Sequence, residues 1–252
     1  MTNWPAEINK TISPADMQRP EVATAARTLR KFGHHLWFKR VPFAVNGVLR
    51  SRWRIRWNKL WEYSRGLAYG EFQPGMRVLD FGGGGTIPVL YLGSVGCEVL
   101  SLDIDAGLTA HTNAVGKKTG WKISGSTFDL TREEPPAEWG KFDRVISFCV
   151  IEHIPKAIQQ TALARLASVL KPGGVFELTF DFGDNAPVEG AVRSVEEAIG
   201  FARATKLPML GDGSFHDTGE RFALDRKYPA NEFTFGSLFL GQAGDKPAGA
   251  RG

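Results

Sequence analysis

Asp80 and the four glycines that follow it are the residues whose types and spacing most clearly suggest chemistry. A short apolar stretch, MRVLDF, ends just before Gly82–Gly85. Glycine lets backbone N–H groups approach a ligand closely, because a side chain at these positions would clash. The dinucleotide spacing GxGxxG fails in either register, since isoleucine or proline takes the place of the third glycine. The phosphate-binding Gly-Lys-Ser/Thr pattern is also absent from this loop.

The carboxylate of Asp80 distinguishes between ligands that such a loop could hold. At the end of a strand it would repel a pyrophosphate and attract a cationic amine, by Coulomb's law. A ligand with an adenosine at one end and an ammonium at the other satisfies both conditions. We therefore predict that S-adenosylmethionine is the cofactor.

A second carboxylate, Asp103, ends the next apolar stretch, CEVLSLDI. Its separation from Asp80 is close to the ~20 residues expected for an acid that binds a ribose. One carboxylate can accept hydrogen bonds from both ribose hydroxyls. Asp105, two residues further, is the second choice for this role.

A third carboxylate, Asp129, ends the stretch ISGSTFDL. It could accept from the adenine amino group, while Phe128, Leu130 or Ile104 packs on the ring. Three acids at three successive strand ends would meet in the crevice at the carboxyl edge of a parallel sheet.

The elements that must position these residues alternate between strand and helix. Apolar strand patterns cover 76–81, 97–104, 123–130, 142–151, 173–182 and 232–240, and helical patterns cover 21–32, 46–68, 107–120, 158–171 and 194–206. Such alternation predicts an α/β fold, a Rossmann-like doubly wound sheet that is mainly parallel with a late antiparallel strand. In the second helical pattern, Trp53, Trp57 and Trp61 recur every four residues and would share one face.

The motifs in this order resemble those of the class I S-adenosylmethionine-dependent methyltransferases. The similarity covers about residues 74–182, and its segments are VLDFGGGG, LSLDID, GSTFDL, FDRVISFCVIEHI and LKPGGVFELTF. The resemblance implies that Asp80 binds the methionine amine and that Gly82 and Gly84 line the methionyl part. It also implies that Cys149 or Val150 lies close to the sulfonium.

Three side chains are candidates for catalysis. Methyl transfer from a sulfonium depends mainly on proximity and orientation, and a general base helps if the acceptor is a hydroxyl. His153 is the first candidate base, although its Glu-His context could instead orient the loop. His216 lies in a Gly/Asp-rich segment that could be a substrate loop or simply solvated. Asp181, at the end of the fifth strand, could face the acceptor or turn the chain.

Charge divides the chain, whose net charge is +4. Residues 1–70 are basic and rich in tryptophan, whereas residues 71–252 are acidic. We predict an N-terminal arm and helical cap over 1–70, an S-adenosylmethionine-binding methyltransferase domain over 71–242, and a disordered tail over 243–252. The basic segment 50–57 could contact phosphates, or its tryptophans could pack on the core while its arginines face water.

Composition restricts the classes of protein and function that remain possible. The chain has 252 residues and only two cysteines, outside any CxxC pair, so we predict no metal site. No signal peptide or membrane span is evident, which predicts a cytoplasmic protein. We predict a methyltransferase acting on a small-molecule acceptor, a hydroxyl of a sugar or another metabolite. The alternatives are an RNA methyltransferase that uses the basic cap and a non-catalytic S-adenosylmethionine-binding module, with a dehydrogenase disfavoured by Asp80.

Overall fold

The computed structural model, which describes residues 4–225, 227 and 229–241, is built around one seven-stranded sheet. The strand order is β1-β9-β8-β7-β4-β5-β6. All neighbouring strands from β8 to β6 are parallel, and β9 runs antiparallel to both β8 and β1. The mainly parallel sheet with a late antiparallel strand is therefore confirmed. Its strands are β1 (Lys10–Thr11), β4 (Arg77–Phe81), β5 (Glu98–Asp103), β6 (Ile123–Thr127), β7 (Phe142–Phe148), β8 (Leu170–Phe182) and β9 (Thr234–Gly241).

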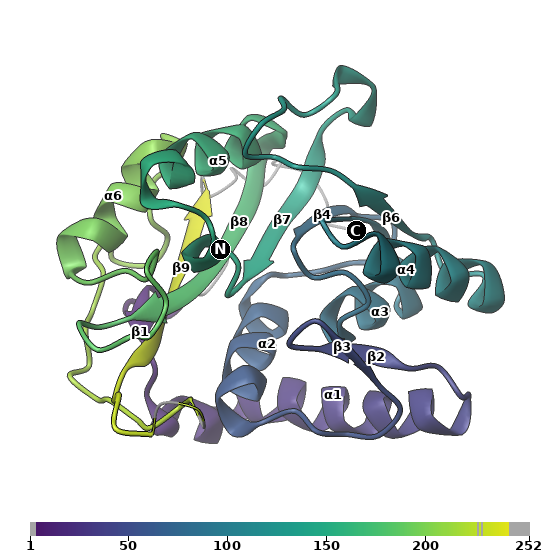
Figure 1. Cartoon of the computed structure of the whole chain (residues 1–252), viewed down its shortest axis with the longest axis horizontal. Helices are drawn as coiled ribbons and strands as arrows, with labels where there is room; N and C mark the ends of the chain where they lie inside the picture. Colours follow the sequence, from purple (N-terminus) through teal and green to yellow (C-terminus); the bar gives the residue numbers. More distant parts are fainter. Residues whose placement is uncertain (1–3, 226, 228, 242–252) are drawn as a thin grey trace, which may run out of the picture.

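Helices cover both faces of this sheet (Figure 1). One face packs against α1, α2, α3 and α4, and the other packs against α5 and α6. The helices are α1 (Pro20–Phe38), α2 (Trp57–Tyr69), α3 (Ile87–Ser94), α4 (Ala106–Thr119), α5 (Lys156–Ser168) and α6 (Val195–Thr205). Short 3-10 helices are η1 (Pro14–Gln18), η2 (Ala137–Trp139) and η3 (Ile151–His153). The doubly wound arrangement follows.

Alternation along the central strands assigns side chains to the two layers. In β7, Val145 packs among the α5 and α6 residues, and Ile146 packs on the opposite face with α1 and α2. Strand β4 alternates in the same way between Val78 and Leu79. The chain leaves β4 toward β5 and β6 but places β7 on its other side. The carboxyl ends of β4 and β7 therefore form the switch point where open α/β sheets bind ligands.

The first residues are part of the sheet, whereas the sequence suggested a loose arm. Strand β1 pairs with β9, with Lys10 opposite Ser237. The flanking Ile8 and Ile12 are fully buried. The side chain of Asn9 donates to Leu210 O at 2.7 Å and accepts from Phe239 N at 2.7 Å. Burial and an amide side chain that satisfies backbone groups hold this segment against the sheet.

The predicted helix over 46–68 is correct only in its second half. Residues 43–50 form a two-stranded hairpin, β2 (Phe43–Val45) and β3 (Val48–Arg50), and α2 begins only at Trp57. The hairpin turns at Asn46-Gly47, where both residues have positive φ (48° and 71°), as a two-residue hairpin turn requires. Trp53 therefore lies outside the helix and does not share a face with Trp61.

Helix α1 also differs from its prediction, because it continues through Gly33 to Phe38. A Cβ at Gly33 would lie 2.4 Å from the ring of Trp53, so glycine here provides room for the tryptophan and does not end the helix. Within the described residues, no helix is long and apolar enough to cross a membrane. The predicted tail, 243–252, lies outside the described residues.

Candidate active site

Asp80 lies at the carboxyl end of β4 with 1% of its surface exposed. Its Oδ2 accepts hydrogen bonds from Ser101 Oγ at 2.5 Å and from Gly83 N at 3.1 Å. Its Oδ1 is buried and has no hydrogen-bond partner among the described residues. Burial raises the pKa of Asp80 to about 7, and the Asp103 carboxylate adds to the increase. A buried carboxylate oxygen without a donor is a site for a cationic or hydrogen-bond-donating ligand.

The glycine loop bends back onto the two carboxylates. Gly82 has φ +76°, and a Cβ there would lie 2.5 Å from the side chain of Val150, so only glycine fits. Gly83 N donates to Asp80, and Gly84 N donates to Asp103 Oδ2 at 3.2 Å. The sequence selected Gly82 and Gly84 as ligand contacts. The structure adds Gly83, which the run of four glycines left ambiguous.

Asp103 ends β5 beside this loop, and 8% of its surface is exposed. Its Oδ1 accepts from Asp105 N at 2.9 Å, and both oxygens therefore have one backbone donor. Each carboxylate oxygen has two lone pairs, so Asp103 can still accept hydrogen bonds from further hydroxyl groups. Asp105 instead caps α4, accepting from Gly107 N and Leu108 N at 2.7 and 3.1 Å. Of the two acids, the geometry favours Asp103 for the ribose.

The residues predicted to hold adenine follow β5 and β6. Ile104 is 75% exposed, unusual for a large apolar side chain, and it directly follows Asp103. Phe128 N donates to Asp103 O at 3.2 Å, which places the two segments side by side. The ring of Phe128 packs edge-on against Trp139 with centroids 4.8 Å apart. Asp129 accepts from Thr131 and pairs with Arg132, and these hydrogen bonds lower its pKa.

The β2–β3 hairpin lies against the glycine loop. Ala44 N donates to Gly85 O at 2.7 Å, and His111 Nε2 on α4 lies 2.9 Å from Pro42 O. The N-terminal segment therefore reaches the edge of the site, where the sequence predicted a cap.

On the other side of β4, Cys149 follows β7 with φ +53° and is buried. Its N–H donates to Thr179 Oγ1 at 3.0 Å and to Thr179 O at 3.1 Å. Cys149, Glu152 and Asp181 each bring one donor atom within 4.8 Å of the other two, close enough to hold a metal ion. The prediction that the chain has no metal site remains a prediction.

Helix α2 adds two residues that the sequence did not indicate. Lys59 Nζ lies 3.2 Å from Glu62 Oε1, and Glu62 Oε2 accepts from Thr179 Oγ1 at 2.7 Å. Glu62 is fully buried, which is rare for a glutamate. Their three-residue spacing on one helical face, among residues 57–69, was the only available signal.

The two predicted histidines occupy different places. His153 ends η3 after β7, and much of its surface is exposed. The part of its imidazole that is shielded from water disfavours the charged form and so lowers its pKa. His216 bridges to Lys10 outside β1, and its Nε2 lies 2.8 Å from Asp212 Oδ2. Strands β9, β8 and β7 separate β1 from β4, which is roughly 19 Å at about 4.8 Å per strand. The structure brings Asp181 near the switch point and does not bring His216 there.

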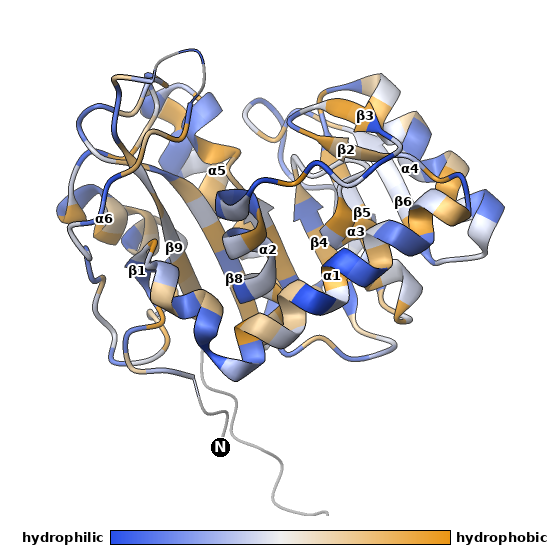
Figure 2. Cartoon of the chain, turned by 90° about the horizontal axis from the view of Figure 1, so that it is seen from below, coloured by the Kyte–Doolittle hydropathy of each residue, from blue (hydrophilic) through white to orange (hydrophobic). Residues whose placement is uncertain are grey.

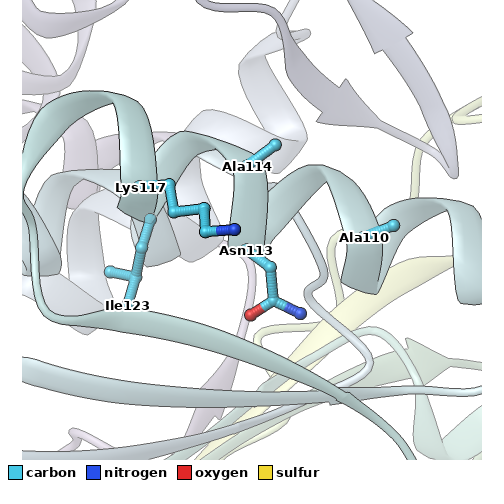
Figure 3. Close-up of a pocket in the computed structure, with 5 residues that line it drawn as sticks. All are labelled: Ala110, Asn113, Ala114, Lys117 and Ile123. Atoms are coloured by element: carbon cyan, nitrogen blue, oxygen red, sulfur yellow. The ribbon is translucent and has the colours of Figure 1, made fainter.

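A shallow hollow elsewhere on the surface is separate from this site. It lies between α4 and β6 and is lined by Ala110, Asn113, Ala114, Lys117 and Ile123 (Figure 3). The Asn113 amide bonds both backbone groups of Gly125, at 2.9 Å each. The Asn113 side chain therefore already pairs with the exposed backbone groups of the edge strand β6. We assign no ligand to this hollow.

Comparison with known proteins identifies the class. Residues 78–174 match a family described as a methyltransferase domain. The matched segment contains Asp80, the glycine loop, Asp103 and the Glu-His pair of the switch point. Residues 78–174 therefore form a methyltransferase domain similar to those of the class I S-adenosylmethionine-dependent enzymes, and S-adenosylmethionine is the cofactor of this domain.

Curated relatives match less than half of the chain. The ubiquinone biosynthesis O-methyltransferase of Roseobacter denitrificans is 32% identical over 117 residues, 45% of this chain and 44% of that protein. The protein of the same name from Xanthomonas euvesicatoria pv. vesicatoria is 34% identical over 105 residues, 40% of this chain and 41% of that protein. The matched region thus spans less than half the length of these relatives.

Solved structures support the fold over more of the chain. The cyclase SpnF has a TM-score of 0.58 at 16% identity, covering 89% of this chain and 97% of that chain. TehB from Haemophilus influenzae has a TM-score of 0.53 at 17% identity, covering 67% of this chain and 58% of that chain. At such low identity the similarity establishes the fold alone. One neighbour is described as a cyclase, so the fold does not by itself determine the reaction.

Proposed function

We propose that this protein transfers a methyl group from S-adenosylmethionine to a hydroxyl of a small molecule. The observation that carries the proposal is the buried, unpartnered Oδ1 of Asp80 beside the glycine loop. An ammonium group placed there would neutralise the carboxylate and supply the missing donor. When bound, the cofactor supplies a methyl group on an activated sulfur leaving group.

The chain's own residues would hold that cofactor at three points. Asp80 attracts the amine. The backbone N–H groups of Gly83 and Gly84 donate hydrogen bonds to the Asp80 and Asp103 carboxylates and hold them in place. Asp103 accepts hydrogen bonds from the ribose hydroxyls, and Ile104 offers an apolar surface to the adenine. Asp129 stays a candidate for the adenine amine, with its Thr131 and Arg132 contacts as competitors.

Support for a small hydroxyl acceptor comes from the relatives, which are named as O-methyltransferases of ubiquinone biosynthesis. The similarity to these relatives covers less than half of this chain, and the acceptor side of this chain also uses α2 and β8. We therefore propose the reaction type and leave the identity of the acceptor open. The division at residue 70 into a cap and a methyltransferase domain is likewise our proposal, as is a cytoplasmic location.

The direct test is transfer of a radiolabelled methyl group from S-adenosylmethionine to a panel of phenols, sugars, alcohols and amines. We expect label in hydroxyl compounds and stoichiometric S-adenosylhomocysteine. The Asp103→Ala variant is the control and should lose transfer at low cofactor concentration. Cofactor binding without transfer to any compound or RNA would contradict catalysis and favour a binding module.

RNA is a second candidate acceptor, favoured by one observation. The segment from the end of β3 to α2 is mostly hydrophilic (Figure 2). Arg50 at the end of β3 and Arg52 and Arg54 in the following coil are exposed. Such arginines could contact phosphates. The opposing features are Trp61 and Ile55, which are buried as in an ordinary amphipathic segment. RNA affinity that falls steeply with salt and is lost on replacing the three arginines would favour this candidate.

A further inference from the structure

Four ionisable side chains gather at the carboxyl ends of β7 and β8, beside the cofactor loop. Lys59 and Glu62 come from α2, Glu152 from η3 and Asp181 from β8, and we call this group the acidic cluster. Three acids face one lysine, so the cluster holds more negative than positive charge when its acids are ionised. Nothing in the cofactor assignment uses these residues.

One carboxylate oxygen of the cluster has no hydrogen-bond partner among the described residues. Glu152 is 2% exposed, and its Oε2 has no hydrogen-bond partner among the described residues. Its carboxylate lies within 4.8 Å of the Asp181 carboxylate and of Cys149 Sγ, so it is aimed into the cluster. A buried carboxylate oxygen left unpaired is costly, and in native proteins it usually marks a ligand, water or ion.

The cluster opens to solvent at one end. Glu62 is fully buried, whereas Asp181 is 8% exposed and the Lys59 side chain is 18% exposed. Of the three acids, Asp181 is therefore the one most accessible from solvent. Glu62 is tied to Lys59 and Thr179 and is not available to the ligand in the same way.

The backbone joins the cluster to the cofactor loop. Val150 is the side chain that a Cβ at Gly82 would strike, at 2.5 Å. Its neighbour Cys149 is anchored to Thr179 on β8, two residues before Asp181 on the same face of the strand. The cluster therefore lies on the β7–β8 side of the switch point, across from Asp80 and Asp103.

We propose that the acidic cluster is the acceptor subsite and that Asp181 is the general base, with Glu152 as the second hydrogen-bond acceptor for a hydroxyl-bearing substrate. The proposal rests on the proposed function. The acceptor hydroxyl gives its proton to the Asp181 carboxylate, and its oxygen forms a bond to the methyl carbon. The carbon–sulfur bond breaks, and its electron pair stays on sulfur. Lys59 stabilises the charge that develops on the acceptor oxygen.

The protonation behaviour of the cluster suits this role. Burial raises the pKa of Asp181 to about 7, opposed by Lys59. The groups that face Asp181 are Lys59 and Glu62 from α2, Cys149 and Glu152 after β7, Asp225 before β9, and Arg193 before α6. A base is most effective when its pKa lies near the working pH. Burial and the neighbouring Asp181 carboxylate also raise the pKa of Glu152.

The experiment compares Asp181→Asn with Asp143→Asn, a matched change at the opposite end of the sheet. Asp143 begins β7 and pairs with Lys171 at 2.8 Å. Three quantities are measured: S-adenosylhomocysteine affinity, thermal stability at pH 8, and labelled methyl transfer to catechol, phenol, glucose and benzylamine at saturating S-adenosylmethionine. A metal-free preparation, dialysed against EDTA, is assayed in parallel.

We expect Asp181→Asn to bind S-adenosylhomocysteine like the wild type and to lose about 100-fold or more in kcat. The wild-type kcat should rise with pH through about 7, and this limb should disappear in the variant. The folded protein binds more protons than the unfolded chain between about pH 4 and 7, so ionised Asp181 lowers stability at pH 8. Asp181→Asn should therefore not lower the melting temperature, whereas Asp143→Asn should.

Other outcomes overturn the inference. Normal turnover in Asp181→Asn, or a large loss of its stability, would make the cluster structural. Transfer to benzylamine alone, or to none of the hydroxyl probes by a wild type that binds the cofactor, would contradict a hydroxyl subsite. Activity that is lost with EDTA and restored by Mg²⁺ would show that the acidic cluster holds a metal ion, and it would contradict Asp181 as a free general base. Failure of the wild type to bind S-adenosylmethionine would refute the proposed function itself.

Discussion

The two sides of the switch point are built in different ways. On the β4–β5–β6 side, Asp80 and Asp103 accept hydrogen bonds from backbone N–H groups of the glycine loop, which directly follows Asp80 in the sequence. On the β7–β8 side, the acidic cluster joins residues from α2, η3 and β8, and its hydrogen bond from Thr179 to Glu62 spans 117 positions. The first side is local and backbone-based, and the second is assembled from distant side chains.

This difference separates what is shared from what is particular to the chain. The match to methyltransferase domains covers 78–174, which includes the whole cofactor side. Lys59, Glu62 and Asp181 lie outside it. We infer that cofactor binding is inherited with the domain, whereas acceptor choice depends on the N-terminal segment and on β8.

The largest effect is expected for a substitution on the cofactor side, at Asp103. If Asp103 holds the ribose as proposed, Asp103→Ala removes an acceptor of hydroxyl hydrogen bonds, each worth roughly 1.5 to 3 kcal/mol because the acceptor is charged. The affinity for S-adenosylmethionine should fall about 100-fold, as measured by titration calorimetry. An unchanged affinity would remove Asp103 from the ribose site.

The next effect is a pH dependence on the same side. The pKa of Asp80 is raised to about 7, so the carboxyl gains a proton as the pH falls through that value. Only the ionised form attracts the amine, and the association constant should fall roughly 10-fold between pH 7.5 and 6. Asp80→Asn should bind weakly and show little change over this interval. Parallel pH curves for the two proteins would contradict the assignment.

A smaller effect sharpens the distinction between neighbouring acids. Asp105 caps α4, so Asp105→Ala should cost about 1 kcal/mol of folding free energy without changing cofactor affinity. Chemical denaturation measures the first quantity and calorimetry the second. A loss of affinity as large as that of Asp103→Ala would mean that Asp105 also contacts the ribose.

The smallest effect concerns the acceptor side. His153 is exposed, and the acidic cluster already contains a base. With Asp181 in that role, His153→Ala should change kcat by less than about threefold. Steady-state assays at saturating S-adenosylmethionine measure it. A loss as large as that of Asp181→Asn would return the histidine to the role that the sequence first suggested.

The strands and the glycine loop of the cofactor side could be predicted because their sequence signals are local, whereas the ligand contacts there remain predictions. The strand that ends at Asp80, the glycines and Asp103 are contiguous motifs, and the order of strands and helices follows from periodicity. On the acceptor side the sequence offered Asp181 as a candidate from its place at a strand end. The rest could not be predicted, because no sequence pattern indicates that Glu62 meets Thr179 or that Glu152 Oε2 lacks a partner. The Asn46-Gly47 turn did carry a signal, but the tryptophan spacing obscured it.

The central claim is that Asp80 and the glycine loop bind S-adenosylmethionine. The most direct test is calorimetric titration of the purified protein with S-adenosylmethionine, S-adenosylhomocysteine, NAD and NADP. We predict saturable binding of the first two compounds and none of the dinucleotides. Binding of NAD or NADP alone, or no binding of S-adenosylmethionine, would contradict the account.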